Sequence, residues 1–173
     1  MLGLFHIPFE IRVADIDETM DPAQKPFDEV ARVSGLKAAA TPHAAGDVVV
    51  AADTIVVCEG RILGKPHNEA EARAMLRLLS GRDHQVMTGV TVLKGKQCIT
   101  HAEVTHVTFR QLSDAEIDAY VATGEPMDKA GAYGIQGGAA LFCEKLNGDY
   151  YNVMGLPVCR LGIMLRQVAP ELF

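Results

Sequence analysis

The sequence lacks the features that mark disulfide-stabilised, zinc-binding or membrane proteins. Its four cysteines are scattered and include no C-x-x-C pair, which argues against zinc and favours free thiols in a reducing compartment. No apolar run approaches the roughly twenty residues that a membrane span requires. The first residues contain no basic stretch and no small-residue cleavage site, so we expect no signal peptide. These absences predict a cytoplasmic protein without a membrane partner.

An excess of basic residues is also missing. The formal net charge is −6, which argues against a nucleic-acid polymer as partner, because such binding usually requires a basic face. A small phosphorylated ligand remains possible, since a local lysine cluster with a metal ion can override the global charge. The 173 residues, 49% of them hydrophobic, suffice for one domain with a proper core.

Hydrophobic periodicity predicts interleaved helices and strands. We expect helices over residues 26–40, 69–79, 113–124 and 157–168, and strands over 9–13, 47–57, 85–93, 98–109 and 139–143. The Asn147-Gly148 pair predicts a hairpin turn, after which residues 150–154 would pair back. Hairpins among the helices indicate a mixed sheet. The expected fold is therefore α/β and elongated, with two lobes around a cleft.

Asp53 interrupts the most strand-like segment of the chain. The run DVVVAADTIVV at residues 47–57 is rich in β-branched residues, as expected of a central strand buried on both faces. A carboxylate in such a strand is unfavourable unless it is paired or metal-bound. Asp53 is therefore either a functional residue or a hydrogen-bonded structural one.

A second acidic feature follows the predicted first strand. Asp15, Asp17 and Glu18 place three carboxylates within four residues. Such a group could hold a divalent cation, or it could be an acidic turn.

The stretch GEPMDKAGAYGIQGGAALF at residues 124–142 is dense in glycine. Glycines allow close approach of a ligand to the backbone, and consecutive amides in such turns can hold anions. Asp128 and Lys129 adjoin the loop, and Gln136 could read the edge of a base or a sugar. The alternative is a glycine-rich surface loop without a ligand.

Two further lysines, Lys37 and Lys65, could contact a phosphorylated ligand, and the family resemblance described below is what singles out Lys37. Lys37 lies near the end of the helix predicted over 26–40, and Lys65 follows Gly64 in a GKP sequence. The glycine spacing there is not that of a P-loop. Lys37 could equally be a solvated helix residue.

Four short motifs occur in order along the chain: ADT at 52–54, GKP at 64–66, KAGAYGIQG at 129–137 and GDYYNVMGLP at 148–157. Together they resemble the Maf family of nucleoside triphosphate pyrophosphatases, from Phe9 to about Leu161. Several motifs in order are more specific than one glycine pattern. The resemblance implies a single Maf-like domain over residues 1–173, with a fold related to the inosine triphosphate pyrophosphatases.

The resemblance also implies a reaction and a site. A nucleoside triphosphate would be cleaved between its α- and β-phosphates, giving the monophosphate and pyrophosphate. Asp53 would be the general base, and Glu18 with Asp53 would bind a divalent cation, Mg²⁺ or Mn²⁺. Asp128 is a second candidate for activating water. Such chemistry requires a neutralised triphosphate, a positioned water and a base.

The remaining assignments concern the substrate. Lys37, Lys65 and Lys129 would neutralise the phosphates. Asp53-Thr54 and the GIQG sequence resemble the branch of the family that acts on dTTP and UTP. Thr54 and Gln136 would then contact the pyrimidine base or its sugar. The apolar C-terminal helix, with residues 169–173 at its end, is a candidate for a homodimer interface.

One departure from the family pattern concerns the start of the sequence. The family has a Ser-x-Ser-Pro-Arg-Arg loop ahead of the segment equivalent to Leu2-Gly3-Leu4, and this sequence has none. A misplaced start codon and a truncated variant both explain this. Because arginine is the usual phosphate clamp, the alternative is a non-catalytic nucleotide-binding protein linked to septum formation or cell-division arrest. A metal-dependent hydrolase for another phosphorylated substrate is a third hypothesis.

Overall fold

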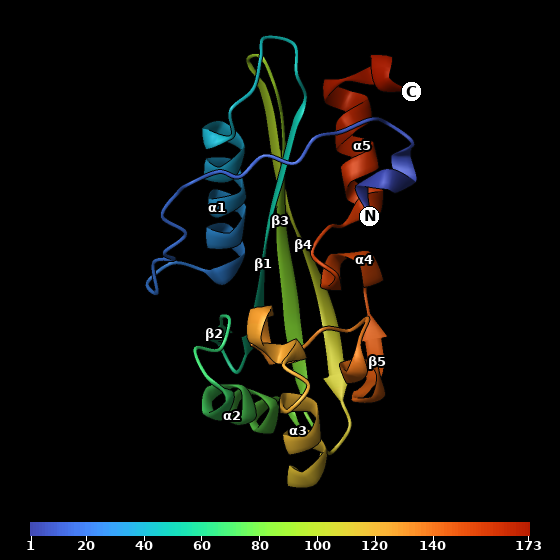
Figure 1. Cartoon of the computed structure of the whole chain (residues 1–173). Helices are drawn as coiled ribbons and strands as arrows, with labels where there is room; N and C mark the ends of the chain where they lie inside the picture. Colours follow the sequence, from blue (N-terminus) through green and yellow to red (C-terminus); the bar gives the residue numbers. More distant parts are fainter. The chain divides into compact units, whose positions relative to one another are not determined.

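The computed structural model describes residues 1–173, in which strands and helices alternate (Figure 1). The strands are β1 (Val49–Cys58), β2 (Arg61–Leu63), β3 (Asp83–Lys94), β4 (Gln97–Phe109) and β5 (Cys143–Asn147). The α-helices are α1 (Pro26–Ala40), α2 (Glu69–Leu79), α3 (Asp114–Val121), α4 (Tyr150–Val153) and α5 (Val158–Val168). Short 3₁₀ helices are η1 (Leu2–Phe5), η2 (Glu125–Asp128), η3 (Ala130–Ala132), η4 (Gly138–Leu141) and η5 (Pro170–Leu172).

The strands form one sheet in the order β2-β1-β3-β4-β5. β1 and β2 are an antiparallel hairpin in which Cys58 faces Arg61, with Glu59 and Gly60 at positive φ in the turn. β5 pairs antiparallel with β4. The predicted α/β class is confirmed, and α1 and α2 have the bounds expected from the sequence.

The chain folds into two compact units. Unit 1 comprises Met1–Asp53, Thr88–Glu103 and Gly155–Phe173. Unit 2 comprises Thr54–Met87 and Val104–Met154.

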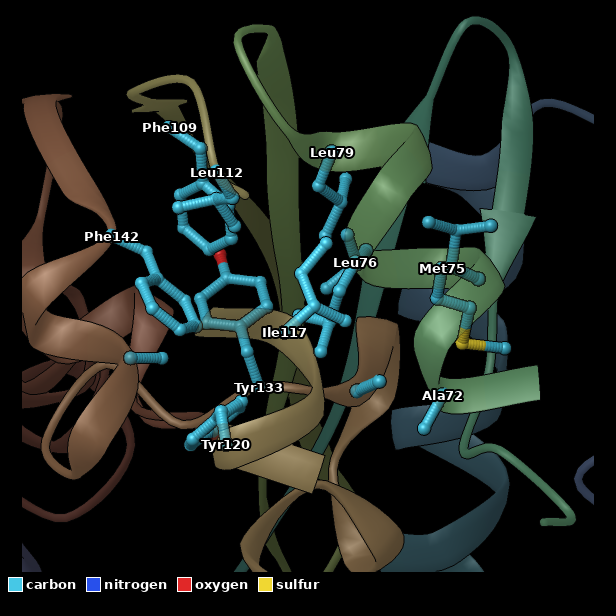
Figure 2. Close-up of a cluster of buried hydrophobic side chains, with 14 of the residues drawn as sticks. Ala72, Met75, Leu76, Leu79, Phe109, Leu112, Ile117, Tyr120, Tyr133 and Phe142 are labelled. Atoms are coloured by element: carbon cyan, nitrogen blue, oxygen red, sulfur yellow. The ribbon is translucent and has the colours of Figure 1, made fainter. Parts of the chain in front are cut away.

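The core of unit 2 is built around α2 and α3, which lie side by side (Figure 1). Asn68 caps α2 by accepting a hydrogen bond from the Glu71 amide at 2.9 Å, which satisfies one otherwise unpaired donor of the first turn. Leu76 and Leu79 on the inner face are fully buried. Figure 2 shows them in one cluster with the rings of Phe109, Tyr133, Tyr120 and Phe142.

Unit 1 has its own apolar cluster, in which α5 packs on β3. Leu161, Met164, Leu165 and Val168 cover Val90 and Val92.

Helix α1 approaches β3 closely because position 89 carries no side chain. A Cβ on Gly89 would lie 2.2 Å from the Val30 carbonyl oxygen of α1. This glycine therefore sets the distance between the helix that carries Lys37 and the strand.

Two predicted strands are wrong. Residues 9–13 form no strand, and Ile11 and Val13 are 87% and 85% exposed. Their alternation fits a strand, but the sheet offers them no partner, and an unpaired strand is not stable. The second wrong strand is the one expected over residues 139–143, most of which belongs to η4, and β5 begins only at Cys143.

The expected return strand 150–154 is also wrong. Residues Tyr150–Val153 form α4, whose first turn is capped by Asp149 accepting from the Tyr151 amide at 2.8 Å. An aspartate directly before a helix is a capping signal that the Asn147-Gly148 turn obscured. β5 consequently pairs with β4 alone.

None of the helices combines the length and the apolar content that crossing a bilayer would demand.

Candidate functional site

Asp53, Lys37 and Glu18 meet in unit 1. The Lys37 ammonium lies 2.7 Å from Asp53 Oδ1 and 3.0 Å from Glu18 Oε2. The side chains of Asp53 and Lys37 are only 11% and 19% exposed, whereas that of Glu18 is 54% exposed. Three residues singled out separately in the sequence thus form one charged cluster.

Each member of this cluster comes from a different kind of segment. Asp53 lies on β1, Lys37 on the last turn of α1, and Glu18 in the irregular segment before that helix. Glu29, buried in α1, fixes that segment by accepting from the Asp21 amide at 2.7 Å and from Arg32.

The electrostatics of the cluster favour ion pairing. Burial disfavours the charged form of Lys37, but hydrogen bonds to Asp53 and Glu18 outweigh it and raise the pKa of the ammonium. Lys37 is therefore a cation at neutral pH, and it offsets the cost of burying the Asp53 carboxylate. The solvated-helix alternative for Lys37 is wrong.

The two carboxylates suit a hard divalent cation. Both point at one ammonium, so their oxygens can converge on one cation, and Mg²⁺ is commonly held by one or two carboxylates together with water and substrate phosphates. No cluster of three or more His, Cys, Asp or Glu side chains suitable for a metal ion occurs in the structure. The donors therefore fit a cation completed by water or phosphate, not an all-protein cage.

Unit 2 gathers three other predicted residues. Gly131 N donates to Gly64 O at 3.0 Å, which joins the GKP loop to the glycine-rich loop. Lys129 pairs with Asp128, and this hydrogen bond, with a smaller contribution from the charge of Lys65, lowers the pKa of the Asp128 carboxyl. Lys65 and Asp128 are exposed, so both can meet a ligand.

The expectation that the glycine-rich loop binds anions through its amides is not supported for most of them. Gly131, Ala132 and Gly137 donate to the carbonyls of Gly64, Lys129 and Gly134. Gly134 and Gly138 donate to side chains, as described below. An amide already committed within the loop is not available to a phosphate. In this part of the structure the lysine side chains, and not the loop amides, are therefore the groups available to bind phosphate.

Close packing against Val56 explains why position 131 of the loop is a glycine. Gly131 has φ +68°, and a Cβ there would lie 2.9 Å from three side-chain atoms of Val56. The loop is therefore pressed against β1.

Gln136 and Thr54 have different surroundings. Gln136 is exposed in the turn of the glycine-rich loop. Thr54 follows Asp53 on β1, and successive strand residues project to opposite faces. The geometry therefore supports Gln136 as a ligand contact more than it supports Thr54.

Glu125 and Tyr120, which the sequence does not mark as site candidates, contact the glycine-rich loop. The Tyr120 hydroxyl accepts from Gly134 N at 3.1 Å and donates to Glu125 Oε1 at 2.9 Å, and Glu125 Oε2 accepts from Gly138 N at 3.1 Å. The periodicity of α3 marks Tyr120 only as a core residue. Glu125, five residues later and next to a proline, gives no sequence signal for its contact with the loop.

Comparison with known proteins identifies the class of protein to which this chain belongs. Residues 1–168 match the family described as Maf-like protein. The chain belongs to the Maf family.

The similar curated proteins carry a more particular name. Proteins from Bacillus cereus (strain AH187), Bacillus thuringiensis subsp. konkukian (strain 97-27) and Bacillus mycoides (strain KBAB4) are each 49% identical over 168 residues, covering 96% of this chain and 88% of the relative. All three are named dTTP/UTP pyrophosphatase.

Proposed function

We propose that this protein is a nucleoside triphosphate pyrophosphatase that hydrolyses dTTP and UTP to the monophosphate and pyrophosphate, as a single Maf-like domain. The observation that carries the proposal is the 49% identity, over 96% of the chain, to proteins named for that activity. It favours a catalytic role over the non-catalytic alternative.

Asp53 is the proposed general base. Water attacks one of the two phosphorus atoms of the α–β phosphoanhydride, and its proton passes to the Asp53 carboxylate. The bridging oxygen leaves with the other phosphorus, as pyrophosphate for attack at the α-phosphorus or as the monophosphate for attack at the β-phosphorus. Lys37 orients this carboxylate, since its ammonium lies 2.7 Å from Oδ1. A positioned base of this kind contributes typically about 10²- to 10⁴-fold to a rate. Asp128 is the second candidate for this role.

Glu18 and Asp53 would hold the divalent cation, Mg²⁺ or Mn²⁺. Such an ion neutralises charge on the phosphates and polarises their oxygens. The Lys37 ammonium contacts both carboxylates and would offset their charge together with the cation. This assignment rests on the donor chemistry of the pair.

The substrate contacts are proposed from unit 2. Lys65 and Lys129 neutralise the triphosphate, and Gln136, with Thr54, contacts the base or the sugar. The exposure of Lys65 and Gln136 supports these roles. The glutamine amide has both a donor and an acceptor, as a pyrimidine edge requires.

The direct test is product analysis with Mg²⁺ over dTTP, UTP, CTP, GTP and 7-methyl-GTP. We expect pyrophosphate and the monophosphate from dTTP and UTP. Release of inorganic phosphate and a diphosphate would contradict the cleavage position. No product from any nucleotide would favour the non-catalytic alternative.

We also propose a cytoplasmic homodimer. All four cysteines are free thiols, in keeping with a reducing compartment. Ile163 on α5 and Phe173 at the C-terminus are 46% and 49% exposed and are candidates for the interface. Light scattering that gives the monomer mass at micromolar concentration would refute the dimer.

A further inference from the structure

The Glu125 carboxylate and the Tyr120 hydroxyl each accept a hydrogen bond from one backbone amide of the glycine-rich loop. Glu125 Oε2 accepts from Gly138 N at 3.1 Å, and Glu125 Oε1 accepts from the Tyr120 hydroxyl at 2.9 Å. The same hydroxyl accepts from Gly134 N at 3.1 Å. Burial raises the pKa of the Tyr120 hydroxyl, so it stays protonated and remains a donor to Glu125.

The two amides that donate these hydrogen bonds bracket Gln136. Between them, Gly137 N donates to Gly134 O at 3.0 Å and closes a turn. Gln136 is the third residue of that turn and is exposed. Hydrogen bonds on either side of Gln136 thus hold its backbone, while its side chain is exposed to solvent.

A side chain at Gly137 would displace the Glu125 carboxylate from its present position. A Cβ on Gly137 would lie 2.0 Å from Glu125 Oε1, and one on Gly134 would lie 3.3 Å from the same atom. A Cβ on Gly138 would lie 3.1 Å from the Tyr120 ring. The absence of side chains at these glycines therefore makes room for Glu125 and Tyr120. Close approach of a ligand is not the only reason for glycine at these positions.

We propose that Glu125 and Tyr120 are a pair of positioning residues that hold the 134–138 turn in the conformation in which Gln136 contacts a pyrimidine nucleotide. The proposal rests on the proposed function. Three glycines leave the free turn with many conformations, and ordering it on binding would weaken affinity. Because Glu125 and Tyr120 order the turn before the nucleotide binds, this cost does not reduce the binding affinity. The pair's hydrogen bonds join the two residues to each other and to the turn, so its effect falls on substrate binding and not on the chemical step.

The distinguishing variant is Glu125→Gln. Glutamine keeps the shape but has one acceptor oxygen where the carboxylate has two, and it carries no charge. It therefore cannot accept from both the Tyr120 hydroxyl and the Gly138 amide, and both charge-assisted bonds are lost. Their loss predicts a rise in KM for dTTP and UTP of roughly tenfold, with kcat changed less than about twofold. Glu144→Gln, the same change at an exposed carboxylate of the same unit, should leave both constants unaltered.

A double variant separates positioning from general damage. If Glu125 acts through Gln136, then Glu125→Gln adds little to the KM of Gln136→Ala, whereas independent effects would multiply. Tyr120→Phe removes the bridging hydroxyl, should raise KM by a smaller factor, and serves if Glu125→Gln does not fold. An unchanged KM in these variants, a fall in kcat alone, or multiplying effects would overturn the inference while leaving the activity intact. A wild-type chain that releases no pyrophosphate would overturn the proposed function, and this inference with it.

Discussion

Lys37 Nζ lies 2.7 Å from Asp53 Oδ1, joining α1 to β1 within unit 1. The contact brings a helix residue and a strand residue 16 positions apart into an ion pair shielded from solvent. Glu18 completes the cluster from 3.0 Å but is half exposed. The negative charge of Asp53 in a strand of β-branched residues is thus balanced by Lys37, without a set of protein ligands that encloses a metal ion.

The Lys37–Asp53 pair should contribute to stability. Lys37→Met keeps the aliphatic length but leaves the Asp53 carboxylate without its cation. We expect the free energy of unfolding to fall by about 1–3 kcal/mol, measured by urea denaturation. Glu18→Gln should have a smaller effect, because an exposed ion pair contributes less than about 1 kcal/mol. Additive effects of Lys37→Met and Asp53→Asn in the double variant would show that the two do not interact.

The close approach of α1 to β3 predicts opposite effects at two glycines of unit 1. Gly89→Ala would place a Cβ 2.2 Å from the Val30 carbonyl oxygen, and we expect it to destabilise the fold by about 2 kcal/mol or more. Gly35→Ala, on α1, meets nothing closer than 3.9 Å and should stabilise the helix by up to about 1 kcal/mol. Thermal unfolding midpoints that move in the same direction would contradict this account of the packing.

His84 should make stability depend on pH. It is 2% exposed, its Nε2 lies 2.8 Å from the Tyr133 hydroxyl oxygen, and burial lowers its pKa from 6.5 to about 4, with the Asp83 carboxylate partly opposing the shift. Because the folded pKa lies below the unfolded one, the unfolded chain takes up the proton first as pH falls. Stability is therefore full above pH 6.5 and should decrease by up to about 3 kcal/mol toward pH 4.

The control for this effect is His84→Gln. Glu29 and Glu116, whose pKa values are lowered to about 2 by Arg32 and Arg110, contribute mainly below pH 4.5, so the comparison belongs between pH 5 and 6.5. The variant should show a flatter dependence of the free energy of unfolding on pH across that window. Equal slopes in the two chains would exclude His84 as the cause.

Local signals in the sequence predict much of the fold. The helices α1 and α2 begin and end where periodicity and caps place them, and the capping box Ser113–Glu116 starts α3. The unusual position of Asp53 in a β-branched strand marks a residue that the structure pairs with a lysine. For the helices the physical cause lies within a few residues of the effect, whereas the lysine that pairs with Asp53 is 16 positions away.

Effects that depend on distant partners were not predictable in this way. Residues 9–13 alternate like a strand, yet no neighbouring strand receives them. The contact of Glu125 with Gly138 joins residues 13 apart through a loop whose path depends on Val56 and Tyr120. No spacing rule relates these positions, so the support of Gln136 becomes visible only in three dimensions.

The Asp53 carboxylate is the group to which the proposed hydrolysis assigns the transfer of the proton from water. The decisive measurement is the kcat for pyrophosphate release from dTTP with Mg²⁺, in the wild-type chain, in Asp53→Asn, and in Asp47→Asn as an exposed control before the same strand. We predict a loss of at least about 10²-fold in Asp53→Asn, with Asp47→Asn unaffected and both variants folded. A folded Asp53→Asn chain that retains the wild-type kcat would contradict the assignment of Asp53 as the base.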